Sequence, residues 1–273
     1  MTDEQIEILS PIFSELVIWK KEKLTKYTEF NNSIISNFEQ LNFINTNTKL
    51  TDIDNILIEF KVEKEKIKEL NKTQSVLFNS LSFFPIGETM HSFLIANLIN
   101  PNSEHGQGDL FLKLFLKILK INDYKETDNW IITAETGRID ILIKRQNPHT
   151  VIVIENKSNF AIDQENQLYR YWHQEIYLPN LKQFGSKTVE KTTNNKNYRV
   201  IYLTPADWKI PSHHTQLKPK GYNTDLPNTM PIVPEIWVFN NQIVEWLSHS
   251  INQLNKENHR LREYIKQYIE LWN

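Results

Sequence analysis

Residues 151–157 (VIVIENK) carry a carboxylate and an ammonium group directly after a run of β-branched aliphatic residues. Such a run predicts a buried strand. Because residues i and i+2 of a strand point to the same face, we expect Glu155 and Lys157 to stand side by side. An ion pair that caps the edge of a sheet is the simplest interpretation. A catalytic pair is the alternative, and the polar residues that neighbouring elements bring close decide between the two.

A second carboxylate, Asp140, lies on the preceding apolar segment. If the chain turns between Asn147 and Pro148, Asp140 pairs with Glu155 across the hairpin, with Cβ atoms about 5 Å apart. Two carboxylates this close repel each other unless one is protonated or a cation lies between them. Oxygen ligands in a chain without cysteine favour a hard ion such as Mg²⁺. The pattern therefore predicts a metal site formed by Asp140 and Glu155 beside Lys157.

The segment after the hairpin, DQENQLYRY (163–171), places Gln167 and Tyr171 on one face of a predicted helix, because they are four residues apart. An amide-rich stripe beside a metal site suits contacts to phosphates and bases. The alternative is that both side chains brace the helix against the sheet.

The rest of the sequence predicts the elements that position these residues. Apolar side chains at helical spacing predict two N-terminal helices, 2–41 and 51–70, joined by a short turn. Later elements are helices at 88–99, 109–120 and 160–178, strands at 130–135, 138–145, 150–157, 198–205 and 235–240, a proline-rich irregular loop at 205–234, and C-terminal helices. One hairpin face is expected in the core, since it carries isoleucine at 139, 141, 143, 152 and 154. The order α-β-β-β-α-β predicts an α/β fold, with a mixed central sheet flanked by helices.

The overall composition limits the kind of protein. The chain has 31 Lys and Arg residues against 33 Asp and Glu residues, so nucleic-acid binding would need a local patch. The absence of cysteine excludes disulfides, thiolate metal sites and a cysteine nucleophile. The sequence contains no run of about 18 apolar residues, so no membrane span is predicted. The acidic N-terminus has no signal-peptide pattern, so a cytoplasmic protein is expected.

The sequence resembles the PD-(D/E)XK nuclease superfamily, in the variety with a QxxxY helix. The resemblance is carried by Asp140, the Glu155-Asn156-Lys157 element and the Gln167-xxx-Tyr171 helix. The upstream segment GETMHSFLIANLINPNSEHGQGDLFLKLFL (87–116) is similar to the block that precedes the core in one bacterial subgroup. One departure is that Ile139 stands where the family name records a proline. The resemblance implies a restriction-endonuclease-like core, with a helical hairpin at 1–75 and the nuclease domain at 76–273.

The resemblance also implies a Mg²⁺-dependent nuclease, in which Mn²⁺ can substitute, that hydrolyses phosphodiester bonds, with DNA as the expected substrate. Phage defence, restriction or repair are the expected settings. Asp140, Glu155 and Lys157 would be catalytic, and the metal site would include Glu88 and the backbone carbonyl of Asn156. The substrate contacts expected from the same motifs are Gln167, Tyr171, His91 and His105. Helix packing is the alternative for His91, and a tight turn beside Gly106 is the alternative for His105.

Two rival interpretations stay open at this level. One is a catalytically inactive nucleic-acid-binding or assembly module that keeps the nuclease fold. The other is a structural ion-pair cluster in an interaction protein.

Two peripheral segments are predicted to contact other molecules. The N-terminal helices support a homodimer or dock a partner protein, and the lysine-rich segment 182–199 forms a flexible loop that closes on phosphate.

Overall fold

The computed structural model of the protein describes residues 46–125 and 127–272, and the predicted helix at 2–41 lies outside the described residues. The chain divides into two compact units between Phe78 and Asn79. The domain boundary after residue 75 stays a prediction. Within the described residues, no helix is both long enough and apolar enough to cross a membrane.

The described part of the first unit is dominated by helix α2 (Thr46–Gln74), which contains the helix predicted at 51–70 and extends it at both ends. Glu–Lys ion pairs spaced i,i+3 lie along this helix. Each contributes little to its stability, because the paired side chains are exposed. Leu57, Ile58 and Val62 are about half exposed. The homodimer or docked partner expected for the N-terminal helices stays a prediction.

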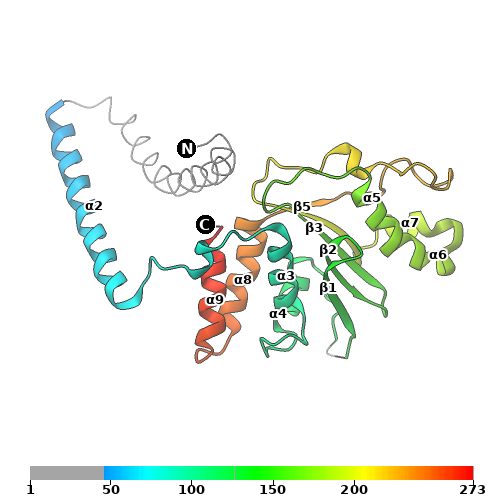
Figure 1. The fold of residues 1–273 in the computed structure, drawn as a ribbon, viewed down its shortest axis with the longest axis horizontal. Coiled ribbons are helices and arrows are strands. Elements are labelled where there is room, and N and C mark those ends of the chain that lie inside the picture. Colours follow the sequence, from blue (N-terminus) through cyan, green and yellow to red (C-terminus); the bar gives the residue numbers. More distant parts are fainter. Residues whose placement is uncertain (1–45, 126, 273) are drawn as a thin grey trace, which may run out of the picture. The chain divides into compact units, whose positions relative to one another are not determined.

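A five-stranded mixed sheet forms the centre of the second unit (Figure 1). Its strands are β1 (Trp130–Thr136), β2 (Ile139–Arg145), β3 (Thr150–Asn156), β4 (Tyr198–Thr204) and β5 (Glu235–Val238). The strand order is β1-β2-β3-β4-β5; β1, β2 and β3 are antiparallel neighbours, and β4 and β5 continue parallel to β3. This architecture confirms the predicted restriction-endonuclease-like α/β core. Leu142 pairs with Val153, which is the predicted hairpin register.

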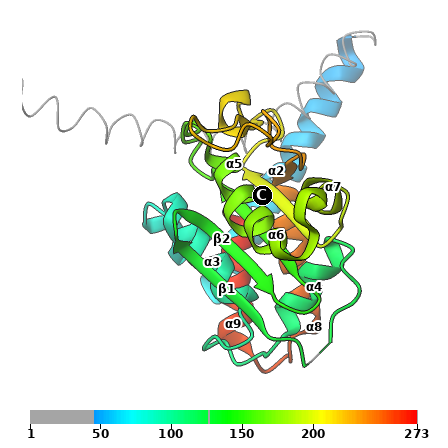
Figure 2. The same cartoon turned by 90° about the vertical axis from the view of Figure 1, so that its right-hand side faces the viewer.

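Helices cover both faces of the sheet (Figure 2). One layer contains α3 (Glu88–Ile99), α4 (Leu110–Ile118), α8 (Val244–Gln253) and α9 (His259–Glu270). The other contains α5 (Gln167–Tyr171), a π-helical turn (Trp172–Tyr177), α6 (Leu178–Phe184) and α7 (Thr188–Thr193). Shorter helical turns lie at Ser80–Phe83, Gly185–Lys187, His213–Gln216 and Phe239–Ile243. Every residue of β3 is buried as a result, and each fully buried aliphatic side chain contributes about 1.5–3 kcal/mol.

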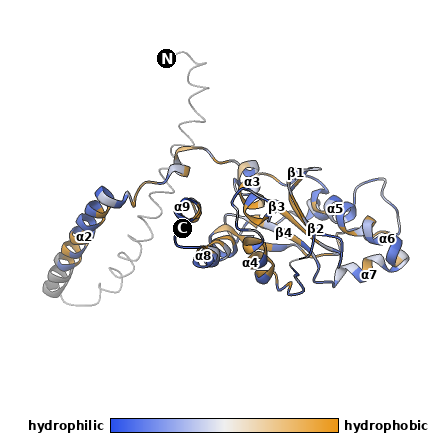
Figure 3. Ribbon diagram, turned by 90° about the horizontal axis from the view of Figure 1, so that it is seen from below, coloured by the Kyte–Doolittle hydropathy of each residue, from blue (hydrophilic) through white to orange (hydrophobic). Residues whose placement is uncertain are grey.

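The sheet carries a core on each side, and the ribbon coloured by hydropathy shows hydrophobic residues along the strands and both hydrophobic and polar residues along the helices (Figure 3). Ile141, Ile143, Ile152 and Ile154 pack in the first core as predicted. Ile139 does not join them, because at the end of β2 its side chain packs in the second core with Leu142. The prediction of a single isoleucine face was wrong at that position.

Two predictions about the segments after β3 were also wrong. The helix expected at 160–178 begins only at Gln167, because Phe160 and Asn166 both have a φ of 58°, in the left-handed region, which interrupts a right-handed helix. The segment 182–199 is not a loop, since it contains the end of α6 and all of α7. Thr188 and Thr192 of α7 are fully buried, so tertiary packing overrides their weak helix propensity.

Candidate active site

The ends of β2 and β3 bring the three predicted catalytic residues together. Ile141 pairs with Ile154, and extension of this register by one residue sets Asp140 beside Glu155. Oδ2 of Asp140 accepts a 2.6 Å hydrogen bond from the backbone N–H of Asn156. Nζ of Lys157 lies 2.6 Å from Oε1 of Glu155. Two carboxylates and one ammonium group therefore converge at one end of the hairpin.

Burial dominates the electrostatics of this cluster. Glu155 is 1% exposed and Lys157 is 4% exposed, so the protein encloses the lysine stem although it follows the end of β3. Burial, with the charge of Glu155, raises the pKa of Asp140 to about 8, and burial also raises the pKa of Glu155. Burial alone would lower the pKa of Lys157, but the negative charges around it, Glu155 first, raise that pKa above its usual value. Without a cation, the two carboxyl groups thus favour holding a proton.

The oxygen atoms of Glu155 fit a divalent cation. Both are buried; Oε1 is ion-paired with Nζ of Lys157 at 2.6 Å, and Oε2 has no hydrogen-bond partner among the described residues. The hydroxyl of Tyr171 lies nearby but donates its proton to the carbonyl oxygen of Arg138. Buried carboxylate oxygens without donors are costly unless a cation or proton compensates them. Oxygen donors of this kind suit a hard ion.

Glu88, the first residue of α3, contacts the loop that follows Lys157. Its Oε1 accepts hydrogen bonds from the backbone N–H groups of Asn159 (3.2 Å) and Ala161 (3.3 Å). Within the described residues, no group of three or more His, Asp or Glu side chains is arranged to hold a metal ion. Glu88 therefore orders the loop that follows Lys157, and its role as a metal ligand stays a prediction.

Asn156 connects the hairpin to α3 from the opposite face of β3. Its Nδ2 donates to the backbone oxygen of Glu88 (2.8 Å) and to Oγ of Ser92 (3.1 Å). The backbone N–H of Asn156 points to Asp140 at the same time. Sequence reasoning assigned only the backbone carbonyl of Asn156, and it missed Ser92, whose type and position carry no recognisable signal. Asn156 fixes both the carboxylate of Asp140 and the start of α3.

Gln167 and Tyr171 lie together on α5, as their spacing predicts. Nε2 of Gln167 donates to the hydroxyl of Tyr171 (2.7 Å), and that hydroxyl donates to the backbone oxygen of Arg138 in the β1–β2 turn. Both side chains are buried, and burial raises the pKa of Tyr171 far above its usual value. These contacts brace α5 against the sheet. Oε1 of Gln167 is buried without a partner, so one acceptor stays available on this helix.

The two histidines have packing contacts. His91 is 4% exposed, lies 2.8 Å from the hydroxyl of Tyr268, and packs against Trp272. Burial lowers the pKa of His91 to about 4, so it is neutral at pH 7. Nδ1 of His105 accepts from the N–H of Gln107, which closes the glycine-containing turn. The structure therefore favours the alternative interpretation for both histidines over the predicted substrate contact.

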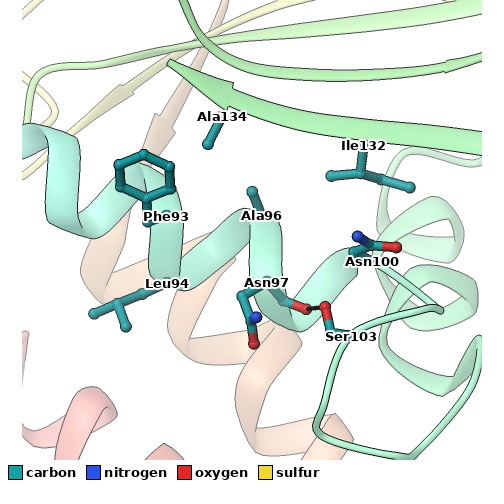
Figure 4. Close-up of a pocket in the computed structure, with 8 residues that line it drawn as sticks. All are labelled: Phe93, Leu94, Ala96, Asn97, Asn100, Ser103, Ile132 and Ala134. Atoms are coloured by element: carbon teal, nitrogen blue, oxygen red, sulfur yellow. Dashed lines mark hydrogen bonds between the residues drawn. The ribbon is translucent and has the colours of Figure 1, made fainter. Parts of the chain in front are cut away.

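A groove of about 350 Å³ lies between α3 and β1 (Figure 4). Phe93 and Ala96 line it from α3, and Ile132 and Ala134 line it from β1. None of the predicted site residues lines this groove. The carboxylate cluster instead lies on the sheet face that carries Val153, which packs in the α5 core.

Comparison with known proteins places the site in a family context. A family model described as the PD-(D/E)XK nuclease superfamily matches residues 78–270, a range that includes every predicted site residue. No curated protein and no solved structure shows a significant match. Proteins of this superfamily are generally nucleases and typically use divalent metal ions.

Proposed function

The chain belongs to the PD-(D/E)XK nuclease superfamily, and from this premise we propose that it is a Mg²⁺-dependent nuclease that hydrolyses phosphodiester bonds in DNA. The observation that carries the proposal is the buried convergence of Asp140, Glu155 and Lys157 at the ends of β2 and β3. The two acidic residues and the lysine of the family motif are present, and its proline is replaced by Ile139. We place the protein in the cytoplasm because its N-terminus has no signal-peptide pattern, and in phage defence, restriction or repair by resemblance alone.

The residues of the cluster have separate roles in this proposal. Asp140 and Glu155 would hold the ion, with the backbone carbonyl of Asn156 and the carboxylate of Glu88 as further ligands, and Mn²⁺ would substitute. A bound divalent ion lowers the pKa of a coordinated water and polarises the phosphate. The N–H of Asn156 orients Asp140 through the 2.6 Å hydrogen bond. The raised pKa of Lys157 keeps its ammonium group charged, so it can offset negative charge on the phosphate in the transition state.

Gln167 and Tyr171 would be the substrate contacts beyond the metal ligands. Gln167 and Tyr171 hold α5 against the hairpin, and the free acceptor Oε1 of Gln167 faces no protein donor. The net charge of the chain is −2, so phosphate binding relies on local cations such as Lys157 and not on the overall field.

The second candidate is an inactive nucleic-acid-binding or assembly module with the same fold. The second oxygen of Glu155, Oε2, favours the nuclease: it is buried without a donor, and a purely structural ion pair with Lys157 gains nothing from leaving it so. A structural ion-pair cluster is the third interpretation, and it has no use for a divalent ion.

Two measurements on the purified protein test these candidates. Calorimetric titration with Mg²⁺ and Mn²⁺ should show binding, and incubation with linear, circular and single-stranded DNA and RNA should show cleavage that requires Mg²⁺ and stops on chelation. Ca²⁺ should bind with little turnover, because its coordination is looser. Metal binding without cleavage of any polymer would support the inactive module. If the protein neither binds a divalent ion nor cleaves a polymer, the results would support the structural ion pair.

A further inference from the structure

Two exposed aromatic rings stack beside the catalytic cluster. Phe160 and Trp208 have ring centroids 5.2 Å apart and planes inclined by 9°. Phe160 is 43% exposed and Trp208 is 70% exposed, although each covers part of the other. Ile162 and Ile210, two positions further along each loop, are also exposed. A soluble surface does not usually collect large apolar side chains in one place without a ligand.

Both rings emerge from the sheet edge that carries Lys157. Phe160 follows β3 and Trp208 follows β4, and these strands are parallel neighbours, so their carboxyl ends meet at one edge. Ligands of open α/β sheets commonly bind at such an edge. The N–H of Phe160 donates to the carbonyl oxygen of Lys157 (2.9 Å), so the first ring is anchored directly to the catalytic residue.

The backbone under the rings is held in place from several sides. Glu88 accepts the N–H groups on either side of Phe160, whose φ of 58° is uncommon for an aromatic residue. Nζ of Lys209 donates to the carbonyl oxygen of Ala161 (3.3 Å), which ties the second loop to the first. A strained backbone conformation of this kind persists only where several surrounding contacts hold it in place. Such conformations occur most often at functional sites.

A buried carboxylate also joins the loop after β3 to the loop after β4. Asp163 is 6% exposed and accepts the N–H and the hydroxyl of Ser212, both at 2.7 Å, and the hydroxyl of Tyr202 at 2.8 Å. These bonds lower the pKa of Asp163 and keep it ionised against its burial. Asp163 lies three residues after Phe160, and Ser212 lies four residues after Trp208. The stacked rings therefore stand on a preorganised support.

We propose that Phe160 and Trp208 form a platform on which an unpaired nucleobase of the substrate stacks while the adjoining phosphate lies at Lys157. The inference rests on the proposed nuclease function and adds a strand preference to it: the bound nucleotide is single-stranded or unpaired near the cut. Bases inside a duplex have their faces covered, so only an unstacked base can use the exposed indole. Every base has a π-face, so the contact tolerates any sequence.

Fluorescence anisotropy with a short labelled single strand, and with the matching abasic strand, tests the platform on the full chain in Ca²⁺. We expect the wild-type protein to bind the base-bearing strand about tenfold more tightly than the abasic one. Trp208→Ala and Trp208→Leu should remove that preference, and Trp208→Phe should retain most of it. The Leu variant keeps apolar area without a π-face, so it separates stacking from general apolar contact. Val233→Ala, at an 82% exposed position of the same long loop, is the matched control and should behave as wild type.

Three outcomes overturn the platform: equal wild-type affinity for the two strands, wild-type behaviour of Trp208→Leu, or a base preference that survives in Trp208→Ala. The wild-type Leu result would replace aromatic stacking by general apolar contact with the base. A parallel cleavage assay in Mg²⁺ keeps the two proposals apart. Cleavage without a base preference would support the nuclease and contradict the platform. A Trp208-dependent base preference without cleavage would support the platform and contradict the nuclease.

Discussion

The ammonium nitrogen of Lys157 lies 2.6 Å from Oε1 of Glu155, and the two side chains are 5% and 1% exposed. Removal of one partner from a buried ion pair leaves the other charge uncompensated, at a cost of about 3–5 kcal/mol. Substitutions in this pair therefore change stability as well as chemistry. Loss of stability alone cannot separate a catalytic lysine from a structural one, and metal binding and cleavage have to be measured on folded variants.

Glu155→Ala should abolish both cleavage and Mg²⁺ binding, and it should destabilise the fold by about 3–5 kcal/mol, because the buried Lys157 loses its partner. Repulsion between Asp140 and Glu155 taken alone would have suggested the opposite sign. Glu155→Gln is the matched variant: its amide oxygen still accepts from Lys157, so it should lose metal binding at a much smaller stability cost. Urea unfolding and calorimetry measure the two quantities. An unchanged Mg²⁺ affinity in both variants would exclude Glu155 as a ligand.

The metal-free protein should lose stability as pH rises from about 6.5 to about 8. The pKa of Asp140 is raised to about 8 in the folded state from 3.8, so over this range the folded protein binds more protons than the unfolded chain. The slope is at most about 1.4 kcal/mol per pH unit for each such proton. Between pH 4 and 6.5 the effect of His91 has the opposite sign, because its pKa is lowered from 6.5 to about 4 and the unfolded chain binds the extra proton.

Denaturant unfolding at pH 6.5, 7.2 and 8 in chelator should show this decline. Asp140→Asn should flatten it, and saturating Mg²⁺ should do the same because the ion replaces the proton as the compensating charge. A stability that rises with pH across this window in the metal-free wild type would contradict the protonated carboxyl pair.

Replacement of His91 by Ala should destabilise the protein by about 2–5 kcal/mol, since it opens a cavity among aromatic rings and leaves the hydroxyl of Tyr268 without its 2.8 Å partner. The cleavage rate of the folded fraction should equal that of wild type. Melting temperature and single-turnover rate, measured on the same preparation below the melting range, test the assignment. A specific loss of cleavage in fully folded protein would instead restore the predicted substrate contact.

The sequence was sufficient to predict the hairpin and its register. The strands alternate with period two, and a turn between Asn147 and Pro148 leaves a single pairing that sets Leu142 opposite Val153, as the structure has it. The carboxylate cluster followed from that register. The mixed sheet followed from the order of strands and helices.

The errors share a physical cause, which is long-range packing that local patterns do not encode. Lys157 is buried because the loops after β3 and β4 fold together through Asp163 and Ser212, 49 positions apart in the chain. The helix α7 forms in a Lys- and Thr-rich segment because Thr188 and Thr192 are buried. His91 points into the α9 core because of a partner 177 positions away. Glu88 was placed near the site, but its bonds to the backbone of the 157–161 loop had no sequence signal.

The cleavage rate of Lys157→Met in Mg²⁺ tests the central claim most directly. Methionine keeps the volume of the lysine stem, and Glu155 can take up a proton, since burial already raises its pKa. Calorimetry should show that Mg²⁺ still binds, and Lys144→Met, which breaks the more exposed pair with Glu175, is the control. We predict that Lys157→Met loses at least about 10²–10³-fold in single-turnover rate while Lys144→Met cleaves as wild type. A folded Lys157→Met protein that cleaves as fast as wild type would contradict the catalytic role of this lysine.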